Sequence, residues 1–373
     1  ILVPTLAMRR NLGTEMENQM AKNTKKKSKK AKNKALILAI EIIVLLILSL
    51  VLFITIKLSK INKDRTSMEG VETNDDISAE SQALMDDYTT IALFGLDNRS
   101  NGDLSSGRSD VIMLATINNK TKSVDLVSVY RDTYLDVGSS TFRKCNEGYA
   151  KGGPTQAVTM LNKNLDLDIK DYVTVDFNAI IECVDLLGGV ELTITDDEAS
   201  LMKGYMDELN KLTGNSSQYL SSGGTYTLDG VQACAYARIR YGGGDDYRRT
   251  ERQRTVISAM VTKAKQSNIL TLNKVINAMF ADIQTSFSNT ELLSLATSLF
   301  SYDIGESTGF PFKKATIKLS SAGDVVVPCD LTTNVSQLHE LLYDDTGYEP
   351  SSTVKNNSAQ ITTDTGFTAN DGY

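Results

Sequence analysis

The sequence predicts an α/β protein, a three-layer α-β-α sandwich around a central mixed sheet, preceded by one N-terminal transmembrane helix. Beyond residue 88, short runs rich in β-branched residues alternate with segments whose apolar residues recur at helical spacing. This alternation is typical of a sheet that is covered by helices. Ahead of it, residues 35–56 are almost wholly apolar. At about 1.5 Å per residue, a helix of that length is enough to cross a bilayer.

Charge around the apolar segment predicts its orientation. Ten basic residues precede it in a tail at residues 1–34, and four follow shortly after, Lys57, Lys60, Lys63 and Arg65. Positive charge favours the cytoplasmic side, and no small-residue cleavage site follows the segment. We therefore expect a single-pass protein of the cell membrane with a cytoplasmic N-terminus. A linker at residues 57–87 would lead to an extracellular domain at residues 88–345, and the polar residues 346–373 are expected to be disordered.

The overall charge limits the classes of ligand. Residues 1–65 carry 14 Lys/Arg and 4 Asp/Glu, a balance of +10, and the remainder carries 25 and 42, a balance of −17. A domain that is acidic overall argues against non-specific binding of nucleic acid. The single histidine, His339, lies in an expected helix far from the arginines and is expected to be a packing residue. Histidine-dependent hydrolase mechanisms and histidine-rich zinc sites are thereby disfavoured.

The first three expected strands each have charged residues at one end. The strands are residues 89–96, 111–117 and 124–129, and their charged neighbours are Asp97, Arg99, Arg108, Asp110, Arg131 and Asp132. The second and third strands are expected to form a hairpin, which places Asp110 and Arg131 at the same edge of the sheet. Asp97 joins them if the first strand runs parallel to the third.

Further elements follow in alternation. A loop at residues 145–154 leads into a helix with Ala157, Leu161 and Leu165, and Asn334 is expected to cap a later helix at residues 335–342. The other expected elements are a strand at 172–177, a helix at 179–187, a strand at 190–194, helices at 196–212, 272–280 and 292–300, and a strand at 325–327. Together they support the mixed sheet.

Arginine is concentrated in residues 236–255, which hold six of the ten arginines beyond residue 66. The planar guanidinium fork of arginine matches the oxygens of phosphate. If residues 237–241 are extended, Arg238 and Arg240 point to the same face. The helical spacing that follows turns Arg249, Arg252 and Gln253 inward. The segment therefore predicts an anion site, although a solvated helix entry with local ion pairs to Asp245, Asp246 and Glu251 would also explain it.

Cysteines and carboxylates leave further alternatives open. Cys145, Cys183, Cys234 and Cys329 could form two disulfides in three possible pairings, or stay reduced and buried. Asp97 and Asp110 are candidate ligands of Mg²⁺, which Mn²⁺ can replace, because Mg²⁺ prefers one or two carboxylates with waters and phosphate oxygens. An Asp at a strand end can equally be a turn residue. A pyrophosphate between Mg²⁺ and arginines would have its developing charge neutralised.

These motifs, in this order, resemble the LytR-CpsA-Psr family. The resemblance covers roughly residues 88–265 and rests on the motifs at residues 95–99, 107–110, 128–133 and 187–190, on Asn146 with Gly152 and Gly153, and on residues 236–253. The sequence departs from the family at Tyr130, where proline is usual, and at Cys145 and Gly148. The family consists of cell-surface phosphotransferases of mainly Gram-positive bacteria. They move teichoic acids, capsular or other glycopolymers from polyprenyl pyrophosphate carriers onto peptidoglycan.

The resemblance also implies residue roles. Asp97 and Asp110 would bind Mg²⁺, and an apolar tunnel inside the sandwich would hold the lipid. The pyrophosphate would be surrounded by Arg99, Arg108, Arg131, Arg238, Arg240 and Arg249, with Gln253 placing the head group. Arg131 is the expected catalytic arginine. Asp132 or Asp246 would deprotonate the acceptor hydroxyl, or each would orient a neighbouring arginine.

The sequence thus predicts an Mg²⁺-dependent phosphotransferase that joins a glycopolymer to peptidoglycan at the membrane surface. Two other readings use the same arginines. One is a non-catalytic surface receptor for lipid-linked or wall polymers, which would need no Mg²⁺ pair. The other is a polyprenyl-pyrophosphate hydrolase.

Overall fold

The computed structural model describes residues 62–63, 68–96, 104–240, 246–288, 291, 294–295 and 298–373, all within one unit that spans residues 60–373. The expected basic tail and transmembrane helix lie outside these residues, as do Asp97 and Arg99. Among the helices that the structure does describe, none combines the length and the apolar character that crossing a bilayer requires.

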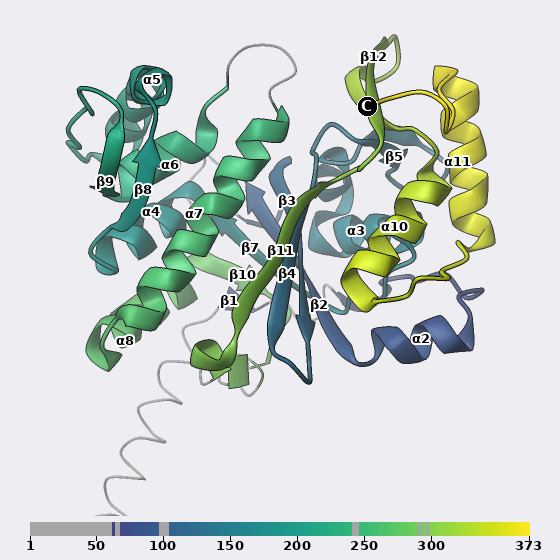
Figure 1. The fold of residues 1–373 in the computed structure, drawn as a ribbon, viewed down its shortest axis with the longest axis horizontal. Coiled ribbons are helices and arrows are strands. Elements are labelled where there is room, and N and C mark those ends of the chain that lie inside the picture. Colours follow the sequence, from purple (N-terminus) through teal and green to yellow (C-terminus); the bar gives the residue numbers. More distant parts are fainter. Residues whose placement is uncertain are drawn as a thin grey trace, which may run out of the picture. The chain divides into compact units, whose positions relative to one another are not determined.

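A mixed sheet forms the centre of the described part, with seven strands in the order β1-β10-β7-β2-β3-β4-β11 (Figure 1). The antiparallel pairs β2–β3 and β3–β4 make β2 parallel to β4, and β7 is parallel to β2. The expected hairpin is therefore confirmed, and β2 ends at the edge where β4 ends. The strands are β1 (Asn62–Lys63), β2 (Tyr88–Leu96), β3 (Ser109–Asn118), β4 (Ser123–Val129), β7 (Asp171–Asp176), β10 (Ile283–Thr285) and β11 (Asp303–Phe310).

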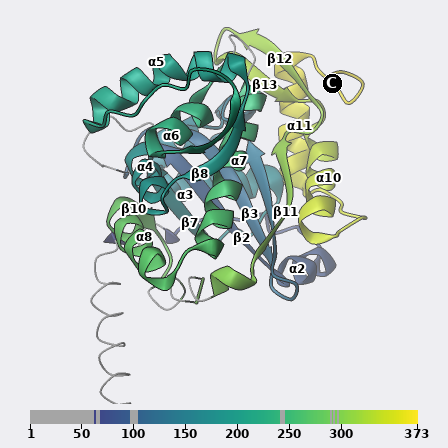
Figure 2. The ribbon, with the colours of Figure 1, turned by 60° about the vertical axis from the view of Figure 1, so that its left-hand side comes forward.

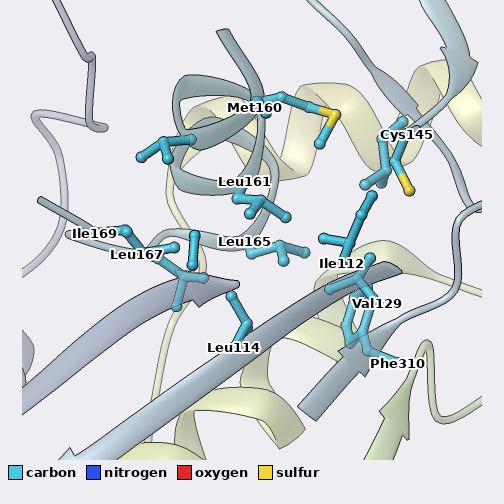
Figure 3. Packing of buried hydrophobic residues seen from close by; sticks show 14 of the residues in the cluster. Ile112, Leu114, Val129, Cys145, Met160, Leu161, Leu165, Leu167, Ile169 and Phe310 are labelled. Carbon is cyan, nitrogen blue, oxygen red and sulfur yellow. The ribbon is translucent and has the colours of Figure 1, made fainter. Parts of the chain in front are cut away.

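One face of the sheet is covered by α3 (Glu147–Leu165) and α10 (Leu331–Tyr343), and α11 (Ser352–Thr365) packs against these two helices. Alternate residues of β2 and β3, including Phe94, Ile112 and Leu114, enter the main hydrophobic core on this side. Figure 3 shows Leu161 and Leu165 of α3 facing Ile112 and Leu114. We call this the packed face.

The opposite face is covered by α4 (Phe177–Leu186), α6 (Gly230–Arg238), α7 (Asp246–Gln266) and α8 (Ile269–Asp282). The intervening residues of the same strands, Leu93, Val111 and Met113, point to this side and cluster with Ile257 of α7. We call this the hollow face, for the cavity described below. With helices on both faces of a mixed sheet, the α/β architecture that the sequence predicts is confirmed.

A smaller core lies beside the hollow face (Figure 2). It is formed by α5 (Asp196–Thr213), α6 and the two-stranded sheet β8 (Val190–Ile194) with β9 (Gly224–Leu228). Both helices begin with a capping box, Thr195 with Glu198 and Asp229 with Gln232. In this motif, side chain and backbone satisfy each other's free N–H groups, which fixes where the helix starts.

Six short elements complete the described part of the chain. The remaining elements are α2 (Ala79–Met85), β5 (Tyr134–Asp136), β6 (Phe142–Lys144), η2 (Leu299–Ser301), β12 (Lys314–Leu319) and β13 (Gly323–Pro328). Strand β5 pairs with β6, and β12 pairs with β13. The expected strand at 325–327 is thus confirmed, whereas much of the expected helix at 292–300 lies outside the described residues.

Both predicted boundaries of the domain, residues 88 and 345, are wrong. Residues 352–365 are not disordered but form α11, because Val354 and Ile361 are buried in the main core. The folded part also starts before residue 88, since Met85 is in the core and Asn74 is 5 % exposed. The Asn74 side chain donates to Lys163 O at 3.0 Å and to Ser351 Oγ at 3.2 Å, which fastens this segment to α3 and α11.

Three local expectations are also corrected. The loop at 145–154 is already helical from Glu147, with a break at Gly152 and Gly153, where φ of Gly153 is 64°. Asn334 does not cap α10, whose N-cap is Asp330; it accepts hydrogen bonds from the backbone N–H groups of residues 312 and 313 instead. Cys145, Cys183, Cys234 and Cys329 are buried and none is joined in a disulfide, which favours the second of the two alternatives, reduced and buried thiols.

Candidate functional site

The site begins where β3 starts and β4 ends, at the sheet edge that the hairpin predicts. Asp110 is the second residue of β3, and Arg131 comes two residues after β4. Nη1 of Arg131 lies 2.6 Å from Oδ1 of Asp110. The expected proximity of these two residues is therefore confirmed.

Helix α7 adds a buried carboxylate that holds three arginines. Oδ1 of Asp246 lies 2.7 Å from Nη2 of Arg240, 3.0 Å from Nη2 of Arg249 and 3.6 Å from Nε of Arg131. Arg249 also donates to the backbone oxygen of Asp110 at 3.1 Å. Asp246 is 8 % exposed and Arg249 is 5 % exposed. The start of α7 is thus tied to the sheet edge by a connected ionic network, as the inward helical spacing predicts.

Burial and neighbouring charges act in opposite directions on these arginines. Burial lowers the pKa of Arg249 to about 10; Asp246 opposes this shift, and Arg131 and Arg240 add to it. Burial also acts to lower the pKa of Arg131, but Asp110, Asp246 and Asp132 outweigh it and leave that pKa above its usual value. Both side chains remain cationic at neutral pH. Their guanidinium groups lie close enough together for one anion to contact more than one of them.

The arginines line a cavity of about 220 Å³. Its wall is formed by Asp110, Val111, Arg131, Phe177, Tyr205, Arg238, Arg240, Arg249 and Gln253. Four arginines and one carboxylate, Asp110, line it, and Asp246 and Glu208 pair with these arginines from outside the lining. We call this the arginine pocket.

A second cavity, of about 250 Å³, lies on the hollow face between β2, β3, β7 and the helices α4, α6 and α7. Its wall is mostly apolar and includes Leu93, Met113, Ile180, Val256 and Ile257. The two cavities have four lining residues in common, Val111, Phe177, Arg238 and Gln253. An apolar cavity that adjoins a cationic pocket suits a ligand with an apolar chain and an anionic head.

Arg238 reaches the pocket by another route than the sequence predicts. Residues 237 and 238 are not extended, because α6 continues to Arg238. Its guanidinium lies 4.9 Å from the ring centre of Phe177 and 5.6 Å from that of Tyr205, and Nη2 is 3.2 Å from Oε2 of Glu208. The convergence of Arg238 and Arg240 on one cavity holds nonetheless.

Sequence reasoning missed the two aromatic residues. Phe177 directly follows β7, whose end lies at the same sheet edge as the end of β2, so its position could have been inferred. Tyr205 lies within α5, far along the chain from every charged motif, and nothing local marks it.

Other predicted residues lie at varying distances from the pocket. Arg108 does not line it: the side chain is 68 % exposed and lies 3.9 Å from Glu147. Asp132 is not in the wall either, and its Oδ1 is 3.0 Å from Nζ of Lys144. Arg252 forms a buried ion pair with Glu198 at 2.9 Å, which is a structural contact. The places of Asp97 and Arg99 lie outside the described residues.

Of the two predicted Mg²⁺ ligands, only Asp110 lies within the described residues. Within the described ranges, no group of three or more His, Cys, Asp or Glu side chains could hold a metal ion. Asp110 lines the arginine pocket, and its side chain is 23 % exposed. A carboxylate that shares a pocket with phosphate-binding groups suits Mg²⁺, which takes few protein ligands and completes its shell with water and phosphate.

Comparison with known proteins identifies relatives of this chain. The sequence profile described as "LytR_cpsA_psr family" matches residues 48–316. The transferase "Polyisoprenyl-teichoic acid--peptidoglycan teichoic acid transferase TagU" of Enterococcus faecalis is 35 % identical over 202 residues, 54 % of this chain and 59 % of the relative. Its counterpart TagT of Bacillus subtilis is 29 % identical over 235 residues, 61 % of this chain and 70 % of the relative. The chain thus spans less than two thirds of the E. faecalis protein.

A solved structure has the same fold. The protein described as "LytR-CPS2A-psr family protein YwtF (TagT) with bound octaprenyl pyrophosphate lipid" superimposes with a TM-score of 0.52 and 23 % identity. The match covers 71 % of this chain and 92 % of that protein. At this identity the likeness concerns the fold alone.

Proposed function

The chain belongs to the LytR-CpsA-Psr family, and from this premise we propose that it transfers a glycopolymer from a polyprenyl pyrophosphate carrier to a sugar hydroxyl of peptidoglycan. The polymer would be a teichoic acid, a capsular polysaccharide or a related wall polymer. One observation carries the proposal: the apolar cavity on the hollow face adjoins the arginine pocket. The polyprenyl chain would occupy the first and the pyrophosphate the second. The lipid in the related TagT structure supports this assignment.

The arginine pocket suits the chemistry of such a transfer. The acceptor oxygen forms a bond to the phosphorus that carries the glycopolymer, and the bond from this phosphorus to the bridging oxygen breaks. Polyprenyl phosphate leaves, and the hydroxyl proton passes to a carboxylate. Negative charge develops on the phosphate oxygens during this step, and fixed cations such as Arg131 and Arg249 stabilise it.

We assign different roles to the two candidate carboxylates. Asp246 is buried and contacts three arginines, which supports an orienting role. The Asp132 side chain is 22 % exposed, so an acceptor hydroxyl could reach it. We therefore assign Asp132 the role of the base that accepts the proton of this hydroxyl. Asp110, together with Asp97, would hold Mg²⁺ or Mn²⁺, which would neutralise charge on the pyrophosphate. Arg238, Arg240 and Gln253 line the arginine pocket and would contact the pyrophosphate and head group. The family resemblance implies the same role for Arg99 and Arg108, but the exposed Arg108 side chain lies outside that lining.

The proposed reaction takes place at the outer surface of the cell membrane. Residues 35–56 would anchor the chain with its basic N-terminal tail in the cytoplasm, and the described domain would be extracellular. The acidic balance of that domain fits a protein that holds its anionic substrate at a local site.

The test uses the full chain, purified in detergent, with a synthetic polyprenyl-pyrophosphate saccharide and peptidoglycan oligomers. Transfer of the saccharide is measured with Mg²⁺ and with EDTA, in the wild type and in Arg131→Ala, Asp110→Ala and Arg249→Ala. Arg248→Ala is the matched control, because Arg248 is the exposed neighbour of Arg249 on α7 and lies outside the arginine pocket. We expect transfer that requires Mg²⁺ and falls at least about 100-fold in the three pocket variants.

Each other outcome points to a different function. Tight binding of the lipid without transfer to any acceptor would favour a receptor. Release of polyprenyl phosphate into water at the same rate with and without peptidoglycan would favour a hydrolase. Asp132→Asn and Asp246→Asn test the roles of the carboxylates: the first should lower the rate of transfer while lipid binding is kept, whereas the second should chiefly weaken binding of the lipid.

A further inference from the structure

A polar cavity of about 650 Å³ lies on the described surface apart from the lining of both cavities above. It is formed by the hairpin β5–β6, by the turn between β12 and β13, and by α11, the last helix of the chain (Figure 1). Its characteristic side chains are Tyr134, Phe142, Arg143, Asn356, Asn357 and Gln360. We call it the amide pocket.

The lining of the amide pocket points to a sugar rather than to a phosphate or an apolar group. Three side-chain amides and several hydroxyl groups offer both donors and acceptors. The charged residues are one arginine and one aspartate, so their charges cancel, in contrast to the arginine pocket. The rings of Tyr134 and Phe142, 5.9 Å apart, lie behind this polar lining and are only 3 % and 8 % exposed, so the accessible wall is mainly polar. We propose that the amide pocket binds a carbohydrate, as a segment of a glycan chain, because a sugar presents many hydroxyl groups that can both donate and accept hydrogen bonds.

Hydrogen bonds already hold the walls of the amide pocket in place. The Tyr134 hydroxyl donates to Oδ2 of Asp364 at 3.1 Å, and Nε2 of Gln360 donates to Oδ1 of the same carboxylate at 2.7 Å. Nδ2 of Asn357 donates to Oδ1 of Asn164 on α3 at 3.1 Å. A pocket whose side chains are fixed in advance loses little conformational entropy when a ligand binds.

The amide pocket shares a structural element with the proposed active site. Strand β6 supplies Phe142 and Arg143 to the amide pocket, and the next residue, Lys144, contacts Asp132 at 3.0 Å. Residue 133, which follows Asp132, forms a bridge to Val326 of β13. A glycan in the amide pocket would therefore be held by the same hairpin that borders the residue proposed to accept the proton.

Much of the amide pocket lies outside the part of the chain that defines the family. The family profile ends at residue 316, and Asn356, Asn357, Gln360 and Asp364 all come from α11. The inference goes beyond the proposed transfer and does not depend on it, because glycan binding can occur without any reaction. The glycan could come from peptidoglycan or from the transferred polymer, and the experiment separates these sources.

The experiment measures binding by isothermal titration calorimetry of the full chain in detergent, without any lipid donor. One arm uses soluble peptidoglycan glycan strands freed of their peptides, and the other uses a lipid-free fragment of wall teichoic acid. Asn356→Trp fills the amide pocket from α11, and Ser321→Trp fills it from the opposite wall; both residues are exposed. Ala359→Trp is the matched control, because it places the same ring at an exposed position of α11 outside the lining.

We expect saturable binding of at least one glycan. Both filling variants should weaken it at least about tenfold, equivalent to about 1.4 kcal/mol, while Ala359→Trp binds as the wild type does. The arm that binds identifies the source of the glycan. Two results would overturn the inference: no binding in either arm, or wild-type binding by both filling variants. If Arg249→Ala abolishes binding that the filling variants keep, the glycan lies in the arginine pocket.

Discussion

The two faces of the central sheet are built by the same strands but differ in how they are filled. On the packed face, Ile112 and Leu114 of β3 are buried in the main core against α3 and α10. On the hollow face, Val111 and Met113, their neighbours in sequence, line a cavity of about 250 Å³. Wall atoms of a cavity lack contact partners on one side and contribute less dispersion energy. The hollow face therefore gives up stability, and in exchange it leaves room for a ligand.

The largest expected effect tests this contrast within one strand. Leu114→Ala should lower the free energy of unfolding by about 2–5 kcal/mol, because it creates a new cavity in the packed core. Met113→Ala should lower the free energy of unfolding by clearly less than Leu114→Ala does. It enlarges a cavity that already exists and removes fewer contacts. Chemical denaturation of both variants measures the difference. Equal losses would mean that the two faces are equally well packed.

The packed face also predicts a dependence of stability on pH. His339 of α10 is fully buried, its Nε2 lies 3.0 Å from Leu165 O, and burial lowers its pKa to about 4. Its unfolded pKa is about 6.5. Between these values the unfolded chain binds the extra proton, so the free energy of unfolding should fall as the pH falls from 6.5 to 4, by about 3 kcal/mol in total.

His339→Leu supplies the control for this prediction. Denaturation of the variant and the wild type at pH 5, 5.5, 6 and 6.5 should show a slope in the wild type that the variant lacks. Because the chain has a single histidine, its proton NMR signal reports the folded pKa directly. A folded pKa near 6.5 would show that water reaches the ring and that this side of the molecule is not tightly packed.

On the hollow face, the arginine pocket is expected to dominate binding of the lipid head. Arg238→Ala should weaken binding of a polyprenyl pyrophosphate by about 1.5–3 kcal/mol, the usual cost of losing a hydrogen bond to a charged group. The variant also loses the contacts of Arg238 with Phe177, Tyr205 and Glu208, so its free energy of unfolding is measured alongside. Calorimetric titration of both proteins measures the loss, and unchanged affinity would remove Arg238 from the binding site.

The smallest expected effect comes from filling the cavity. Ile180→Phe, at a position that lines the apolar cavity and not the arginine pocket, should weaken binding of a long polyprenyl pyrophosphate about tenfold, or about 1.4 kcal/mol, because the ring occupies space proposed for the chain. Binding of inorganic pyrophosphate should stay as in the wild type. If both ligands lose affinity equally, the substitution disturbs the arginine pocket and the cavity does not hold the lipid.

Much of the site was predictable because it rests on local rules. The hairpin predicts the contact of Asp110 with Arg131, and helical spacing predicts that Arg249 turns inward. The extended reading misplaces Arg238 because the capping box of Asp229 and Gln232 starts a helix that continues to Arg238. Helix α11 was missed because its buried residues Val354 and Ile361 are few in an otherwise polar segment.

The sequence by itself determined the order of strands and helices, the inward face of α7 and membership of a family, because these follow from periodicity and motifs within short stretches. The tertiary structure decided that Asp246 holds three arginines from different segments, that one face of the sheet stays hollow, and that α11 closes an amide pocket over β5–β6. Periodicity tells which side of an element is buried. The packing of elements that lie far apart in the chain decides which other element this side contacts, and how closely the two pack.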